Sequence, residues 1–136
     1  SEANASIRNL SPNEEKLAKL INAERVKRGL NPLKVDLELT SLARDKSMDI
    51  IDNDYFSHYS PTYGSPFDML SSFGVKYIYA GENLVGNNDI TKAHNQLMKS
   101  EEHKKNILSA NFTHIGVGVK VGSKYGKIIT QIFIGR

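Results

Sequence analysis

The sequence predicts an α+β fold: a three-layer α-β-α sandwich with a mainly antiparallel central sheet. Apolar residues repeat with helical spacing in the first half of the chain, whereas from residue 115 onward they alternate as they do in strands. The last predicted strand, residues 127–134, is apolar on both faces. A strand of this kind needs cover on both sides, so we expect helices above and below the sheet.

The first helix is expected to begin at Pro12. Ser11 can act as its N-cap, and Glu14, at the third helical position, completes a capping box. Apolar residues then mark one face of the helix, and Gly29 supplies its stop.

A second helix should follow Asp36, which can cap it, and run to about Ile51, because the apolar residues keep helical spacing. Residues 52–65 have the composition of a loop, and a short helix is expected over residues 67–72, ended by Gly74.

Residues 75–84 are apolar and aromatic enough for a strand, which we expect Gly81 to break. A helix is predicted over residues 90–99. Ser100 then has the position of an N-cap for a further short helix that ends near Leu108.

The C-terminal region is predicted to form a hairpin. Residues 115–121 alternate between apolar and other residues, a turn spans residues 122–126, and a second strand covers residues 127–134. Two strands joined by so short a turn run antiparallel.

The composition excludes several classes of function. The chain is 39% hydrophobic and 24% charged, with a formal net charge of +3 and no concentrated basic face, so we expect no nucleic-acid partner. The absence of cysteine excludes disulfides, thiolate metal sites and thiol nucleophiles. No apolar run is long enough for a membrane span. The sequence contains no glycine-rich phosphate loop, and we expect no organic cofactor.

We expect residues 1–10 to be an N-terminal extension, or the remnant of an engineered start, and residues 11–136 to form a single domain. The polar opening is compatible with a signal peptide that has been removed. We expect the domain to be a monomer.

Two histidines are candidates for chemistry. His58 lies in an aromatic loop between Phe56 and Tyr59, and imidazole is both a common metal ligand and a proton carrier near neutral pH. His103 falls in the first turn of the helix after Ser100, where the helix dipole favours a neutral ring and the carboxylates of Glu101 and Glu102 favour the charged one. The alternatives are a loop histidine bonded to the backbone and a histidine on a solvated helical turn.

Glu82 stands out because it interrupts an apolar, strand-like segment. A carboxylate buried there without a partner would be costly, so it should meet an imidazole, a cation or backbone amides. The alternatives are an edge strand with Glu82 in water, or a carboxylate that only fastens a loop.

The remaining candidates have simpler explanations. His94 lies on the apolar face of its helix, which is typical of a core histidine with satisfied hydrogen bonds. His114 begins a strand opposite its apolar face and is expected near the surface. Asp49, Asp52 and Asp54 resemble a calcium loop only superficially, and a solvated helix end explains them better.

Short segments that recur in one known family follow one another along the chain. They cover residues 20–25, 29–33, 39–43, 56–58, 81–84, 100–108, 112–119 and 131–133. Together they resemble the CAP superfamily (cysteine-rich secretory proteins, antigen 5 and pathogenesis-related 1), in its bacterial SCP-like extracellular branch. The resemblance implies an extracellular or cell-envelope protein.

The resemblance implies an α-β-α sandwich and a cleft that holds two histidines and two acidic residues, which in some relatives binds zinc or another divalent cation. The matching positions here are His58, His103 and Glu82. Ser100 occupies the position of the family's second glutamate, so Glu101 or the neighbouring Glu102 is a substitute, or the set is incomplete.

Three functions are compatible with these residues. The first is a secreted, non-enzymatic binding module whose cleft takes a divalent cation such as zinc and a small ligand, lipid or cell-surface partner. The second is a zinc-dependent hydrolase, with His58 and His103 as ligands and Glu82 as the general base. Two histidines and one carboxylate fall short of a secure set of three ligands, which favours the first. The third is a purely structural interaction domain with a vestigial pocket.

Overall fold

The computed structural model describes residues 9–136, so residues 1–8 of the predicted N-terminal extension lie outside the described part. The elements are, in chain order, α2 (Pro12–Lys27), β1 (Lys34–Val35), α3 (Leu37–Asp52), α4 (Pro66–Ser72), β2 (Tyr79–Gly86), α5 (Ile90–Lys99), α6 (Glu101–Ile107), β3 (His114–Ser123) and β4 (Gly126–Gly135). Helices and strands are thus mixed along the chain, as an α+β fold requires.

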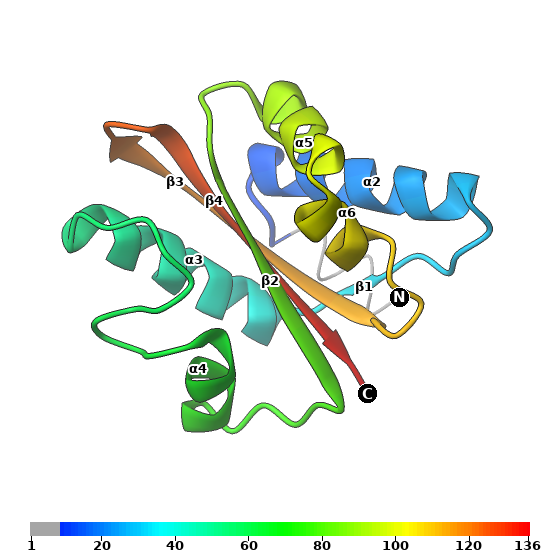
Figure 1. The fold of residues 1–136 in the computed structure, drawn as a ribbon, viewed down its shortest axis with the longest axis horizontal. Coiled ribbons are helices and arrows are strands. Elements are labelled where there is room, and N and C mark those ends of the chain that lie inside the picture. The colour runs from blue at the N-terminus through cyan, green and yellow to red at the C-terminus, as the bar shows by residue number, and fades with distance from the viewer. Residues whose placement is uncertain (1–8) are drawn as a thin grey trace.

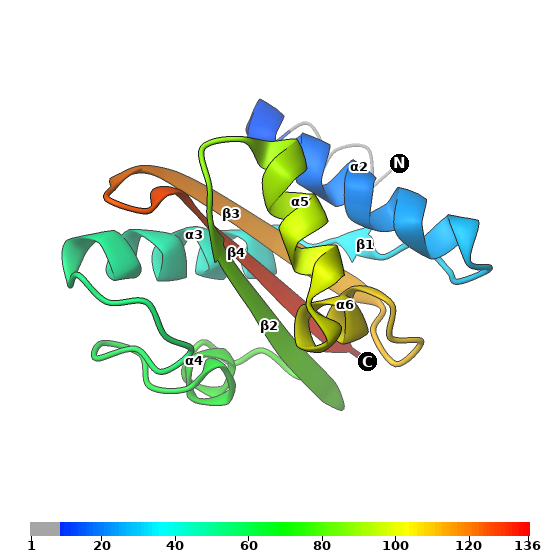
Figure 2. The ribbon, with the colours of Figure 1, turned by 45° about the horizontal axis from the view of Figure 1, so that its top comes forward.

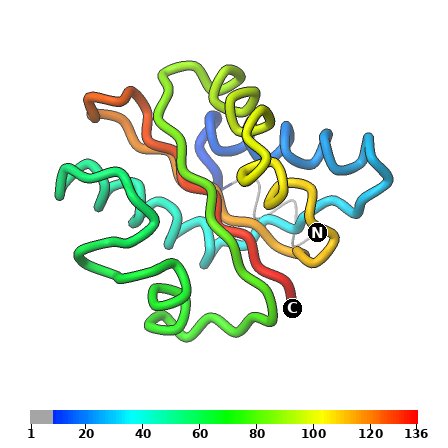
Figure 3. Tube along the Cα trace, in the orientation of Figure 1, coloured from blue at the N-terminus to red at the C-terminus, as the bar shows by residue number. Residues whose placement is uncertain are grey.

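The four strands form one sheet in the order β1-β3-β4-β2 (Figure 1). The β3–β4 hairpin is antiparallel, and β2 pairs antiparallel with the other side of β4. Figure 3 follows the chain through this hairpin and shows β2 running beside it. β1 pairs parallel with β3, which makes the sheet mixed. The predicted mainly antiparallel sheet is confirmed, but the short parallel strand was not predicted.

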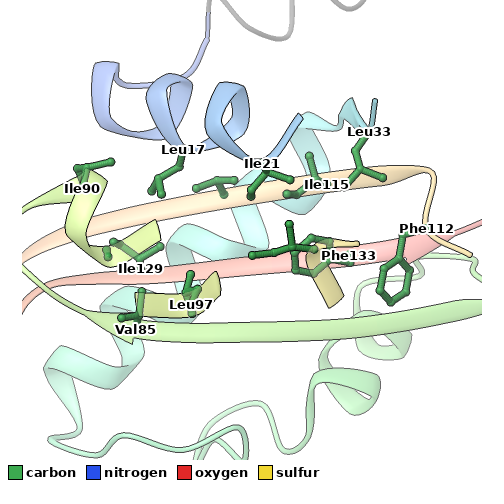
Figure 4. Close-up of a cluster of buried hydrophobic side chains, with 13 residues drawn as sticks. Leu17, Ile21, Leu33, Val85, Ile90, Leu97, Phe112, Ile115, Ile129 and Phe133 are labelled. Atoms are coloured by element: carbon green, nitrogen blue, oxygen red, sulfur yellow. The ribbon is translucent and has the colours of Figure 1, made fainter. Parts of the chain in front are cut away.

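Helices cover both faces of the sheet, which confirms the predicted three layers (Figure 2). On one face α2, α5 and α6 pack over the larger apolar cluster shown in Figure 4. On the other face α3 and α4 enclose a second cluster with the opposite side of β4. Side chains on both sides of β4 are therefore buried, since Ile129 and Phe133 face the first cluster and Ile132 and Ile134 the second.

The helix starts follow the predicted capping chemistry. Ser11 and Glu14 form the capping box of α2, with hydrogen bonds of 2.9 and 3.2 Å between side chains and backbone. Asp36 caps α3 by accepting from the Leu39 amide. No helix between residues 9 and 136 combines the length and the apolar composition needed to cross a membrane.

Two glycines in β3 allow α3 to lie directly on the sheet. A Cβ atom at Gly116 would lie 2.2 Å from the Leu39 carbonyl carbon, and one at Gly118 would lie 2.2 Å from the Arg44 amide nitrogen. Any side chain would therefore push the helix away, and the predicted strand pattern with glycine on one face is explained by this close contact.

The predicted strand over residues 75–84 is wrong in its start and in its break. β2 begins at Tyr79 and continues through Gly81, which pairs with Phe133 of β4. A Cβ atom at Gly81 would lie 2.8 Å from Oδ1 of Asn106. Gly81 therefore admits α6 to the surface of the strand and does not interrupt it.

Candidate functional site

His58 and Glu82 meet directly. The loop between α3 and α4 carries His58 to the surface of β2, where its Nδ1 lies 2.8 Å from Oε1 of Glu82. The Glu82 side chain is 2% exposed, whereas that of His58 is 46% exposed. The second carboxylate oxygen of Glu82, Oε2, is buried and has no hydrogen-bond partner among the described residues. The contact therefore joins a buried carboxylate to a ring that solvent can reach.

The hydrogen bond fixes how His58 presents its ring. A carboxylate only accepts, so Nδ1 carries the hydrogen, and the neutral ring keeps its lone pair on Nε2. The hydrogen bond to Glu82 raises the pKa of His58; burial opposes this, and the charges of Glu82 and Glu102 add to it. His58 can thus offer a lone pair when neutral or a proton when charged, in both cases from Nε2.

Lys46 lies beneath this pair. Its side chain is buried, and its Nζ donates a hydrogen bond of 2.9 Å to the backbone carbonyl of His58. The ammonium also lies 5.0 Å from the centre of the Tyr55 ring. Burial lowers the pKa of Lys46, while the charges of Glu82 and Asp49 raise it. A cation inside the protein therefore offsets part of the cost of burying Glu82.

Asp49 holds the loop that carries His58, so the predicted solvated helix end is wrong for this residue. Its buried carboxylate accepts hydrogen bonds from Tyr55, Ser60, Thr62 and Asn53. Burial alone would raise the pKa of Asp49, but these hydrogen bonds outweigh it and lower the pKa. Four donors from one loop converge on one carboxylate, which fixes the path of the loop.

A chain of amides attaches α6 to β2 beside Glu82. Asn106 donates to Oδ1 of Asn83 at 2.9 Å and to the Glu82 carbonyl at 3.3 Å. Asn83 in turn donates to the His103 carbonyl at 3.1 Å and to Gln131 at 3.2 Å. The first turn of α6 is therefore held next to the strand that carries Glu82.

His103 itself stands at the third helical position of α6, as predicted. Its imidazole makes no hydrogen bond or ion pair within residues 9–136, so of the three predicted groups only His58 and Glu82 are in direct contact. Ser100 is the N-cap, but its side chain does not cap the helix. Glu101 and Glu102 line a surface hollow of about 510 Å³ over α6.

The donor set does not amount to a three-ligand metal centre. No group of three or more histidine, aspartate or glutamate side chains in the described part of the chain is arranged to hold a metal ion. Oε1 of Glu82 is bonded to His58 and Oε2 is buried, so this carboxylate positions the imidazole. The prediction of a zinc site therefore depends on imidazole nitrogen alone, with water or a ligand to complete the coordination.

The site residues that sequence reasoning missed are Lys46 and Asp49. Both lie on the buried face of α3 that also carries Leu42 and Ala43, at helical spacings of three and four. Their spacing is the signal that indicates burial, and their charge is the reason it was overlooked. Elsewhere, His94 is buried as predicted; its Nε2 lies 3.6 Å from Oε1 of Glu24, but neither ring nitrogen has a hydrogen-bond partner among the described residues.

Comparisons with known proteins agree with this fold. The model of the cysteine-rich secretory protein (CAP) family matches residues 18–133. The uncharacterised protein YkwD of Bacillus subtilis is 52% identical over 128 residues, which are 93% of this chain and 49% of YkwD.

Two solved structures are similar. An extracellular protein containing an SCP domain from Bacillus anthracis has a TM-score of 0.84 and 35% identity, with 93% of this chain and 44% of that chain covered. An outer surface protein from Borrelia burgdorferi has a TM-score of 0.84 at 19% identity, with 91% of this chain and 92% of that chain covered, and shares the fold. The chain spans about half the length of YkwD and of the B. anthracis protein.

Proposed function

Because the chain belongs to the cysteine-rich secretory protein (CAP) family, we propose that it is an extracellular binding domain whose ligand contacts Nε2 of His58. The extracellular location is supported by the description of the B. anthracis relative as an extracellular protein. The outer surface protein from Borrelia burgdorferi shares the fold at 19% identity.

The observation that carries this proposal is the hydrogen bond between His58 and the buried Glu82. A half-exposed histidine is ordinarily free to rotate and to change tautomer. A ring that moves in this way does not present a fixed donor or acceptor to a ligand. Here the carboxylate fixes the ring, and Lys46 and Asp49 fix the loop that carries it. These contacts fix the ring and leave Nε2 as the nitrogen without a partner among the described residues, which is the pre-organisation that a binding site requires.

We further propose that a divalent cation binds weakly at this site, with the imidazoles of His58 and His103 as its protein ligands. Glu82 supports such a role because a carboxylate on Nδ1 makes Nε2 a better donor of its lone pair. Two protein ligands are fewer than the three of typical catalytic zinc sites, so we expect modest affinity.

The geometry favours binding over hydrolysis. A general base must reach the proton that it removes. Oε1 of Glu82 is hydrogen-bonded to His58, and Oε2 is buried, so neither oxygen is available to a substrate. Glu82 is therefore placed to orient His58, and the general-base role that the hydrolase hypothesis needs has no support in this arrangement.

Zinc titration by calorimetry tests the proposal. We expect the parent chain to bind one zinc ion with a Kd in roughly the micromolar to millimolar range, and His58→Ala to abolish binding. His103→Ala should weaken it strongly, whereas His114→Ala, which removes an imidazole elsewhere, should leave it unchanged.

The hydrolase alternative is tested on the same samples with a panel of peptide and ester substrates. We expect no turnover above the zinc-only background. Zinc-dependent turnover that disappears in Glu82→Gln while zinc binding persists would overturn the binding-module proposal, and unaltered zinc binding in His58→Ala would remove His58 as the contact.

A further inference from the structure

A group of basic residues lies at the end of the sheet where β1, the start of β3 and the end of β4 come together (Figure 1). A hollow of about 420 Å³ opens there, lined by Arg25, Lys34, His114 and Arg136 among others. Lys34 and His114 are direct partners across the parallel strands, and His114 also pairs with Ile134, two residues before Arg136. Four basic side chains from four segments thus border one hollow.

Arg25 contributes a buried positive charge without a counter-ion. Its side chain is 1% exposed, and it forms no ion pair with any described carboxylate. Its guanidinium donates instead to the backbone carbonyls of Asn31, Ile107, Ser109 and Phe112. Carbonyls satisfy hydrogen bonds but do not neutralise charge, and desolvation lowers the pKa of Arg25 accordingly.

The charges around His114 are also mainly positive. Burial lowers the pKa of His114, and the cations of Arg136 and Lys34 lower it further. Asp36 is the one carboxylate that acts in the opposite direction. Its Oδ1 caps α3, and its Oδ2 lies 3.4 Å from Arg136, so it offsets only part of the positive charge. Protonation of His114 beside Lys34 on the neighbouring strand would therefore be unfavourable unless an anion lay between them.

We propose that this hollow, lined by Arg25, Lys34, His114 and Arg136, is a binding site for a small phosphate-like oxyanion. A tetrahedral oxyanion can accept hydrogen bonds from several directions, and the lining offers a guanidinium fork, an ammonium and an imidazole. Thr113 contacts Nδ1 of His114 at 2.7 Å, so Nε2 is the ring nitrogen left for the anion. The site is separate from His58 and does not depend on the function proposed for it.

The anion site is tested by NMR titration of the His114 ring. Sodium phosphate and sodium sulfate are added in turn, with sodium chloride keeping the ionic strength constant, and sulfate remains doubly charged across the pH range. We expect saturable shifts of the His114 signals with both oxyanions, a higher His114 pKa in their presence, and no response to chloride alone.

Variants then assign the response to the hollow. Arg136→Gln and Lys34→Gln are expected to weaken phosphate binding about tenfold each, because each removes a charge-assisted hydrogen bond. Lys92→Gln makes the same charge change on α5 and should bind phosphate as the parent does. Lys34, Arg136 and Lys92 are all exposed, and thermal melts verify that the three variants fold. Equal responses to chloride and phosphate, or unchanged affinity in Arg136→Gln and Lys34→Gln, would overturn the proposal.

Discussion

Replacing Glu82 by glutamine removes the charge that holds His58 without changing the shape of the side chain. The carboxylate is buried and lies 2.8 Å from Nδ1 of His58, so the substitution converts a charge-assisted hydrogen bond into a neutral one. A hydrogen bond to a charged group contributes about 1 kcal/mol more than a neutral one. Because the His58 ring is half exposed, water screens part of this difference. We therefore expect Glu82→Gln to weaken the hydrogen bond by less than about 1 kcal/mol.

That energy has a measurable counterpart in the titration of His58. Because a neutral amide stabilises the charged imidazole less than a carboxylate does, the pKa of His58 should fall in Glu82→Gln. The measurement is a pH titration of the His58 ring signals by NMR in the parent and the variant, with His114 as an internal control that should not change. An identical His58 titration in both proteins would refute the role given to Glu82.

The same substitution should change stability in a pH-dependent way. The folded-state pKa of His58 is raised, so the pair stabilises the folded protein below the ordinary value of 6.5, and this contribution is lost as pH rises through the folded-state pKa. Urea unfolding should therefore show a larger loss of stability in Glu82→Gln at pH 5 than at pH 9.

Three further predictions concern the groups around the site and the core. Asp49→Ala should lower the free energy of unfolding by about 3 kcal/mol and expose the loop of residues 53–62 to proteolysis, because four donors lose their acceptor, whereas Asp52→Ala on the exposed side should do neither. Burial lowers the pKa of His94, so the parent should lose stability as pH falls below 6.5, and His94→Leu should lose less over the same range; parallel curves would contradict this. Gly118→Ala should cost about 3 kcal/mol in urea unfolding, because its Cβ would lie 2.2 Å from the Arg44 amide, and an unchanged midpoint would show that α3 can move away freely.

Much of the fold could be predicted because local signals and global packing agree. The capping box at Ser11 and Glu14 places the start of α2, and the apolar faces of residues 127–134 require the two helical layers. β1 could not be predicted, because two residues carry no periodicity and their pairing with β3 depends on tertiary structure. Gly81 was misjudged because a glycine needed for close packing has the same sequence signature as one that breaks a strand.

The site could be predicted in part. The cost of burying Glu82 indicates a partner, and His58 is in contact with it. Lys46 and Asp49 were missed because charged residues are normally assigned to solvent, although their spacing along α3 places them on its buried face. The partner of the His103 imidazole could not be predicted, because it depends on the tertiary geometry and on the ligand.

The tautomer of neutral His58, measured from the ring nitrogen-15 chemical shifts above its pKa, tests the central claim most directly. A histidine in water prefers the hydrogen on Nε2, but the contact with Glu82 predicts the hydrogen on Nδ1 and an unprotonated Nε2. Observation of the Nδ1–H tautomer in the parent would match this account. A parent ring with its hydrogen on Nε2 would contradict it, because Nε2 would then have no lone pair to present.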